Sequence, residues 1–195
     1  MTRCYLAALL LAIAALLPFT AAYTQEKPAR EPDVIYVPTP NEVVDKMFEL
    51  ADIRPGEIVY DLGCGDGRIP VLASKKYGVR SWGFDINPVR VKESLDNVQK
   101  NSVQHLVTIK QQDIFELDLS KADVITLYLL PRLNVKLIPQ LDKLKPGCRI
   151  VSHDFNMEGV RPKREIEFRP PGEASRPHRV YLWVTPLEKE RPATP

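Results

Sequence analysis

A run of glycines after a short apolar segment is the part of the sequence best suited to hold a ligand. Gly63 permits a sharp turn out of a strand, and Gly65 permits a ligand to approach the backbone closely. Gly67 leaves backbone amides bare at the start of a following helix, where they attract polar or anionic groups. Loops of this kind bind nucleotides and related cofactors. The whole run is Gly63-Cys64-Gly65-Asp66-Gly67, directly after residues 58–62.

Two details separate this loop from a dinucleotide site. The dinucleotide pattern G-x-G-x-x-G requires glycine at position 68, where this sequence has Arg68. Asp61 precedes the first glycine by two residues, and a carboxylate there would repel a pyrophosphate. It could instead help to hold, through a water or an amide, the cationic amino-acid end of S-adenosylmethionine (SAM). An NAD-dependent oxidoreductase is therefore disfavoured, and a strand–turn–helix without a ligand is the structural alternative.

Two further acids stand at or just after the ends of the next two predicted strands, where they could contact the nucleoside part of a cofactor. Asp85 ends the second predicted strand, and its carboxylate can accept both ribose hydroxyls. Asp113 follows the third strand, where it can accept the exocyclic amine of adenine. Ile86 and Ile114 can sandwich the adenine ring. Alone, each acid could equally be a helix cap or a solvated turn residue.

These residues require parallel strands whose carboxyl ends meet at one edge of a sheet. Strands and helices alternate strictly, which predicts an α/β fold: a Rossmann-like, doubly wound, mostly parallel seven-stranded sheet with a C-terminal antiparallel pair. Asn41 is expected to cap the first helix. The predicted strands are 58–62, 79–85, 106–111, 124–128, 149–153, 165–168 and 180–184, and the predicted helices are 41–51, 69–77, 88–100 and 134–144.

With these motifs in order, the chain resembles the class I SAM-dependent methyltransferases over about residues 38–186. Within that class it resembles bacterial relatives of the mitochondrial lysine methyltransferases that modify the ATP synthase c subunit and the adenine nucleotide translocase. The class resemblance rests on Asp61–Arg68, Gly83–Pro88 and Gln111–Phe115. The narrower resemblance rests on Val37–Pro40, Asp61–Arg68, Asp85–Pro88 and Leu127–Pro131.

The resemblance also indicates where the methyl acceptor would lie. In this class the end of the fourth strand faces the methyl group, and Tyr128 holds that place here. Tyr128, and less directly His153 or Asp154 after the fifth strand, are the candidate catalytic residues that orient or desolvate an amine. Tyr128 could equally be a packing residue. The sequence lacks the Asn/Asp-Pro-Pro-Tyr tetrad of nucleobase enzymes, and the loop Pro38–Pro40 is expected to fold over the cofactor as a partial lid.

The N-terminus is a separate segment of the chain. Residues 1–22 carry one arginine, then an almost wholly apolar stretch, then small residues, which is the layout of a secretory signal peptide or an uncleaved membrane anchor. Residues 23–36 are expected to be a linker, 37–186 the methyltransferase domain and 187–195 a flexible tail. SAM is a cytosolic metabolite, so an exported or periplasmic methyltransferase would lack its cofactor. An uncleaved anchor that leaves the domain in the cytoplasm would remove this conflict.

Composition excludes some classes of partner and site. A net charge of only +2 does not indicate the basic surface that nucleic-acid binding requires, so no nucleic-acid partner is expected. Cys64 and Cys148 should lie at opposite edges of the sheet, too far apart for a disulfide. No metal site is expected, since the histidines are scattered in sequence and show no ligand spacing. They are His105, His153 and His178.

Taken together, the sequence predicts a SAM-dependent methyltransferase that N-methylates a lysine side chain of a protein. The acceptor could also be a small molecule, and a membrane protein is among the protein candidates. The rival from another class is an exported SAM-fold binding module without turnover. A monomer is expected, with membrane association through the N-terminal segment. The predicted cofactor-binding residues are Asp61, Gly63, Cys64, Gly65, Gly67, Asp85, Ile86, Asp113 and Ile114.

Overall fold

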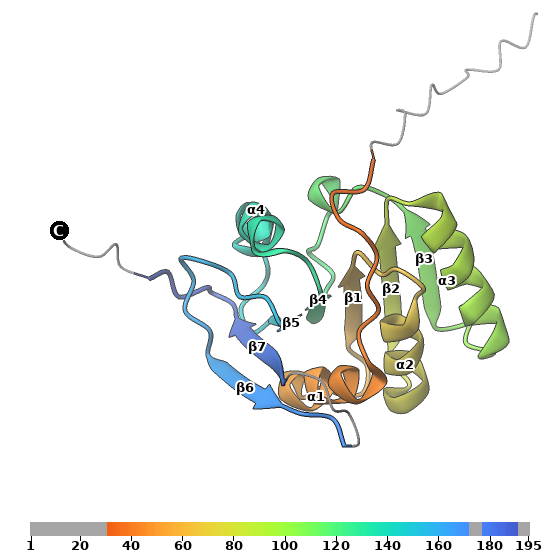
Figure 1. The fold of residues 1–195 in the computed structure, drawn as a ribbon, viewed down its shortest axis with the longest axis horizontal. Coiled ribbons are helices and arrows are strands. Elements are labelled where there is room, and N and C mark those ends of the chain that lie inside the picture. The colour runs from red at the N-terminus through yellow and green to blue at the C-terminus, as the bar shows by residue number, and fades with distance from the viewer. Residues whose placement is uncertain (1–30, 172–176, 191–195) are drawn as a thin grey trace, which may run out of the picture.

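A seven-stranded sheet forms the centre of the computed structural model, which describes residues 31–171 and 177–190 (Figure 1). The strand order is β3-β2-β1-β4-β5-β7-β6. The first five strands are parallel, and β7 pairs antiparallel with both β5 and β6. This confirms the predicted fold class. The strands are β1 (Ile58–Leu62), β2 (Arg80–Asp85), β3 (Val107–Gln111), β4 (Val124–Leu127), β5 (Arg149–His153), β6 (Arg164–Phe168) and β7 (His178–Val184).

Helices cover both faces of this sheet because the central strands are apolar on both sides. Alternate residues of β1 point to opposite faces: Val59 joins one core cluster and Tyr60 the other. Helices α1 (Asn41–Ala51) and α2 (Arg68–Tyr77) pack on the Val59 face, and α3 (Pro88–Lys100) lies beside α2. Helix α4 (Pro131–Leu141) and the short 3-10 helix η1 (Ile114–Glu116) cover the Tyr60 face.

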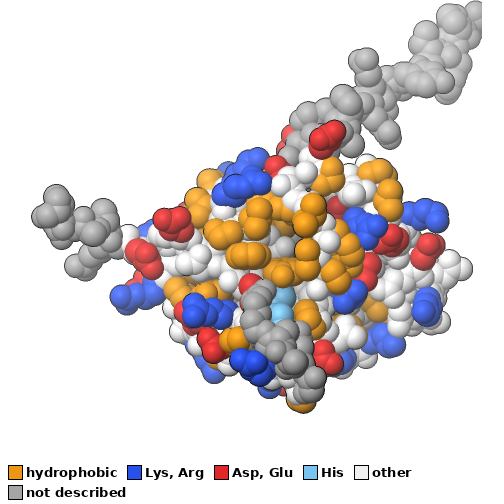
Figure 2. All heavy atoms as spheres, in the orientation of Figure 1, with side chains coloured by type: hydrophobic (Ala, Val, Ile, Leu, Met, Phe, Trp, Pro, Cys, Tyr) orange, Lys and Arg blue, Asp and Glu red, His pale blue; other side chains and the backbone are white. Residues whose placement is uncertain are grey.

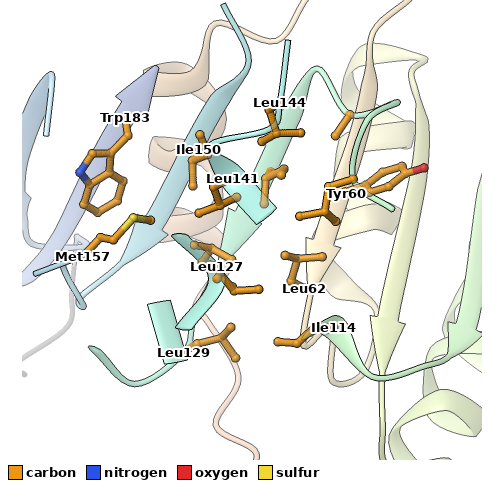
Figure 3. Packing of buried hydrophobic residues seen from close by; sticks show 14 of the residues in the cluster. Tyr60, Leu62, Ile114, Leu127, Leu129, Leu141, Leu144, Ile150, Met157 and Trp183 are labelled. Atoms are coloured by element: carbon orange, nitrogen blue, oxygen red, sulfur yellow. The ribbon is translucent and has the colours of Figure 1, made fainter. Parts of the chain in front are cut away.

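The larger core cluster joins the sheet to α4 (Figure 3). Leu62, Leu127 and Ile150 project from three neighbouring strands toward Leu141 of α4, and all four side chains are fully buried. Trp183 on β7 closes the cluster, and its indole Nε1 donates to the Val160 carbonyl at 3.0 Å. This packing fixes the carboxyl ends of the parallel strands, where the predicted site residues lie.

Two helix starts differ from the sequence expectations. Asn41 does not cap α1: Pro40 holds the N-cap position without a side-chain hydrogen bond, and Asn41 is the first helical residue. Helix α4 starts at Pro131, three residues before the predicted start at Asn134. Proline suits the first helical turn, where its missing amide costs nothing. Asn134 instead lies buried inside the helix, and its side-chain amide donates to the carbonyls of Phe155 and Asn156.

The described chain extends beyond the predicted domain boundaries at both ends. Residues 32–36, expected to be linker, line a cavity over the sheet. Lys189, expected in a flexible tail, forms a β-bridge with Val160 and an ion pair with Asp142 at 2.8 Å. Residues 1–22 lie outside the described residues. Among the helices that are described, none has the length and apolar character that crossing a membrane requires.

Candidate active site

A cavity that is partly open to solvent lies at the carboxyl ends of β1, β2, β3 and β4. This is the edge at which open α/β sheets bind their ligands. Most of the predicted cofactor-binding residues meet there although they are spread over more than fifty positions of the chain. Those that line the cavity, together with the candidate catalytic residue Tyr128, are Asp61, Gly63, Cys64, Asp85, Ile86, Asp113 and Ile114.

Gly65 and Gly67 do not line the cavity, but the loop needs both of them. Gly67 has φ +75° and is the N-cap of α2, and a Cβ there would lie 2.9 Å from the Ser94 side chain. Gly65 has φ +56°, and a Cβ there would lie 2.2 Å from the ring of Tyr36. The sequence predicts close approach of a ligand at Gly65. In the structure the group that approaches this glycine is the Tyr36 ring.

Asp61 places a carboxylate at the floor of the cavity with one oxygen unused. The residue is 2% exposed, and its Oδ1 accepts a hydrogen bond of 2.7 Å from Thr126 Oγ1. Oδ2 is buried and has no hydrogen-bond partner among the described residues. Burial, with a smaller contribution from the charges of Asp85 and Asp66, raises the pKa of Asp61 to about 7. A buried carboxylate of this kind fits a cationic partner such as the amino group of SAM.

The Asp85 carboxylate is held in place by the backbone around it. Its Oδ2 accepts from the Gly65 amide and its Oδ1 accepts from the Asn87 amide, both at 2.9 Å. Each carboxylate oxygen can accept a further hydrogen bond. Because the group lines the cavity with its orientation fixed, it suits a pair of ribose hydroxyls.

The predicted adenine pocket brings Asp113, Ile86 and Ile114 to the same wall of the cavity. Asp113 also caps η1, because its Oδ1 accepts from the Phe115 amide at 3.0 Å. The helix cap that was the alternative role for this acid is thus present, and it holds the carboxylate at the cavity. Ile114 is buried and Ile86 half-buried.

Cys64 is a buried thiol rather than a nucleophile. Burial raises the pKa of the Cys64 thiol well above its ordinary value, so the neutral form persists at physiological pH. Its Sγ lies 3.7 Å from Ser94 Oγ. Cys148 is likewise free and buried, and burial raises its pKa to about 12. Both cysteines are therefore buried neutral thiols, and Cys64 also lines the cavity.

Three aromatic rings form a stack at the ends of β4 and β5. The Tyr128 ring lies 4.0 Å from the His153 ring and 5.8 Å from the Phe155 ring, centroid to centroid. Tyr128 lines the cavity, whereas His153 is fully buried behind it and does not. Any influence of His153 on the cavity is therefore exerted through neighbours that do line it. These are Tyr128 and Thr39, whose Oγ1 lies 3.1 Å from His153 Nδ1.

Residues 32–40, here called the strap, run past β1 and β2 toward the start of α1 (Figure 1). Residues 32–39 of the strap line the cavity. The Arg90 guanidinium stacks 4.6 Å from the centre of the Tyr36 ring. Arg68 donates to the Thr39 carbonyl at 3.0 Å while it pairs with Asp66 at 2.8 Å. The structure thus places the predicted lid, Pro38–Pro40, over the glycine loop.

Sequence reasoning does not identify Tyr36, Arg90 or Phe155 as site residues. Tyr36 directly precedes the Val37–Pro40 motif, and Phe155 comes two residues after His153, so proximity to a motif was the available signal. Arg90 gives no signal at all, since an arginine in the first turn of a helix is ordinary. Its role depends on the strap, whose path the sequence does not predict.

A sheet of this order, with a glycine loop, a buried acid at the β1 end and a second acid at the β2 end, defines a class I SAM-dependent methyltransferase. Comparison with known families agrees. A family model described as "ANTKMT methyltransferase domain" matches residues 61–164. The chain belongs to this family of methyltransferases, and SAM is its methyl donor.

Three relatives show how far the similarity extends. A protein-lysine N-methyltransferase of Saccharolobus islandicus is 45% identical over 155 residues, which is 78% of this chain and 94% of that protein. The lysine N-methyltransferase of Xenopus laevis that is named for the ATP synthase c subunit is 29% identical over 125 residues, 62% of this chain and 53% of that protein. A crystal structure of an RNA methyltransferase from Salinibacter ruber, in complex with S-adenosyl-L-homocysteine, superimposes with a TM-score of 0.70 at 43% identity, covering 81% and 98% of the two chains.

Proposed function

We propose that this methyltransferase acts on the side-chain amine of a lysine in a protein. The observation that carries the proposal is the aromatic and apolar wall at the end of β4, built by Tyr128, Phe155 and Leu129. Tyr128 and Leu129 both line the cavity. The names of the relatives from S. islandicus and X. laevis support the same acceptor.

The wall supplies what lysine methylation requires of the protein. A SAM-bound methyl group is already activated for transfer, so the protein has to position a neutral amine in line with it. An apolar surround disfavours the charged form of lysine and promotes loss of its proton. The Tyr128 ring, which lines the cavity, can then attract the methylated cation that forms. Asp61 would hold the amino-acid end of the cofactor and Asp85 its ribose, so neither has a role in the transfer itself.

The relative from S. ruber is named as an RNA methyltransferase, and the surface of this chain argues against RNA as its acceptor. Hydrophobic side chains gather at the centre of the face that carries the strap (Figure 2). Ile35 and Val37 of the strap are 86% and 50% exposed. Leu130, directly before α4, and Val135, within α4, are also exposed. Nucleic-acid sites are basic, and the whole chain has a net charge of only +2. An apolar mouth suits a protein partner better.

Radiolabelled methyl transfer distinguishes the acceptors. The full chain is incubated with methyl-labelled SAM and an extract of cells that lack this protein, and the product is divided between protease and ribonuclease treatment. We expect label that survives ribonuclease and is recovered as methyllysine after hydrolysis, with none for Asp85→Ala. Label that ribonuclease releases would refute the lysine proposal, and label in small molecules would favour the alternative acceptor class.

We also propose that residues 1–22 anchor a monomeric enzyme to a membrane with its domain in the cytoplasm. The apolar stretch in the sequence and the need for cytosolic SAM support this. The apolar surface around the cavity is compatible with an acceptor at a membrane. Fractionation with protease treatment of intact cells tests the proposal: we expect the chain in the membrane fraction and protected, whereas a soluble, exported, shortened form would contradict it.

A further inference from the structure

One group of metal-ligating side chains comes together in the part of the chain that is described, residues 31–171 and 177–190. It consists of His153 at the end of β5, Asp154 directly after it, and His178 at the start of β7. Antiparallel pairing explains the meeting: His153 stands opposite Val180, so His178, two residues away, lies on the same face of the sheet. The strands lie side by side in Figure 1. In sequence the histidines are 25 residues apart, which hides the cluster.

The distances within the cluster are those of ligands around one ion. His153 Nε2 lies 2.8 Å from His178 Nδ1 and 3.2 Å from Asp154 Oδ2, and His178 Nδ1 lies 3.6 Å from Asp154 Oδ2. Zinc binds imidazole nitrogen and carboxylate oxygen at about 2.0–2.2 Å in a tetrahedron, which places neighbouring ligand atoms about 3.3 Å apart. The three observed separations scatter around that value.

The surroundings hold two of these side chains in an orientation suited to a metal. His153 Nδ1 lies 3.1 Å from Thr39 Oγ1, so it can donate there while Nε2 faces the cluster. Asp154 Oδ1 accepts from the Arg179 amide at 3.0 Å, which leaves Oδ2 toward the histidines. Outer partners of this kind are typical of metal-bound histidine and carboxylate. Asp154 has φ +58°, a backbone conformation that non-glycine residues rarely adopt and that is found preferentially at functional sites.

We propose that His153, Asp154 and His178 bind one divalent transition-metal ion, for which zinc is the best match. Two neutral imidazoles and one carboxylate are ligands that zinc accepts, and three protein ligands leave a fourth position for water. The side chains are at most 9% exposed, so an ion bound by them would be largely shielded from solvent. The ion joins the ends of β5 and β7 and fixes the His153 ring, which in turn contacts Tyr128 and the strap residue Thr39.

The test is metal binding by the full chain and requires no methyl acceptor. Protein stripped with a chelator is titrated with Zn²⁺ and with Co²⁺, whose visible absorption reports tetrahedral coordination. We expect one ion per chain and a higher unfolding temperature when it is bound. In His178→Ala and Asp154→Asn we expect the affinity to fall by about 100-fold or more. Asn tolerates the Asp154 backbone conformation and keeps an acceptor for the Arg179 amide, so this variant should fold.

His105→Ala is the matched control, because His105 is exposed and lies outside the cluster. It should bind the ion as the unaltered chain does. The proposal is overturned if folded protein, verified by circular dichroism and SAM binding, takes up no ion, in which case His153 and His178 simply share a proton. It is also overturned if both cluster variants bind as tightly as the control. Either result leaves the methyltransferase assignment untouched, since SAM binding is measured separately.

Discussion

At the scale of single residues, the acids proposed to bind the cofactor and the ring proposed to contact the acceptor come from different strands. Asp61 and Asp85 come from the ends of β1 and β2, and each accepts hydrogen bonds from defined backbone or side-chain donors. Tyr128 comes from the end of β4 and stacks on the rings of His153 and Phe155. Changes at the acids should therefore alter SAM affinity, and changes at Tyr128 should alter methyl transfer.

Asp85→Ala should abolish measurable SAM binding. It removes two charge-assisted hydrogen bonds to the ribose, each contributing about 1.5–3 kcal/mol, so the affinity should fall at least about 100-fold. Calorimetric titration measures this directly. The control is Asp96→Ala on α3, an exposed acid that lies 3.8 Å from Lys92. SAM binding by Asp85→Ala within a few-fold of the control would remove Asp85 from the site.

SAM affinity should increase with pH through the titration of Asp61. The pKa of about 7 keeps this carboxyl largely protonated at pH 6, whereas the SAM amino group binds its ionised form. The Kd should fall roughly tenfold between about pH 5.5 and pH 6.7, a range in which an α-amino group remains charged. The raised pKa also means that the ligand-free folded state binds more protons than the unfolded chain, so its stability should fall as pH rises from about 4 to about 7.

Asp61→Asn is the matched variant for this prediction. The amide keeps the size of the side chain and an oxygen that can accept from Thr126. We expect weaker SAM binding and no dependence of the Kd on pH over the same range. A Kd that changes with pH as strongly in Asp61→Asn as in the unaltered chain would assign the titration to another group.

Two substitutions at Tyr128 distinguish the contribution of its ring to methyl transfer from that of its hydroxyl. If the ring positions the amine, Tyr128→Phe should retain kcat/KM within a few-fold, whereas Tyr128→Ala should lose about 100-fold because the acceptor is no longer aligned. SAM affinity should change little in both variants. Steady-state kinetics with the lysine-containing acceptor and methyl-labelled SAM gives kcat/KM for both variants. Equal losses in the two variants would instead place the essential group at the phenol hydroxyl.

At the scale of elements, regular strands were predictable and the strap was not. The bounds of β1 and β5 agree with the sequence expectation, because buried parallel strands are short apolar runs that end at glycine or a polar residue. The start of α4 was misplaced because Pro131 resembles a helix breaker as much as a first turn. The strap has no periodicity, and its path depends on contacts with Arg68, Arg90 and His153 that lie far away in sequence.

The strap should control how fast SAM leaves. Tyr36 covers Gly65 and stacks under Arg90, so Tyr36→Ala removes a contact that holds the strap in place. A contribution of about 1–1.5 kcal/mol from a cation–π pair and its packing predicts roughly tenfold faster dissociation of SAM. Stopped-flow measurement of SAM release tests this. Val89→Ala, an exposed apolar change on α3 outside the cavity, is the control. Unchanged dissociation in Tyr36→Ala would mean that the strap does not retain the cofactor.

At the scale of the whole molecule, the described residues, 31–171 and 177–190, include a complete sheet, both core clusters and the cavity. Among these residues the core clusters begin at Val34 and the cavity lining begins at Pro32. A chain that starts at Glu31 should therefore fold and bind SAM with the affinity of the full chain while losing membrane association.

A chain that starts at Asn41 keeps α1 but lacks the strap. It should remain folded and bind SAM at least about tenfold more weakly, because the contacts from Tyr36 and Thr39 are gone. Thermal unfolding and calorimetry on the two shortened chains measure both quantities. Equal SAM affinity in the two would show that the strap contributes nothing to binding, and loss of folding in the chain from Glu31 would show that residues 1–30 belong to the folding unit.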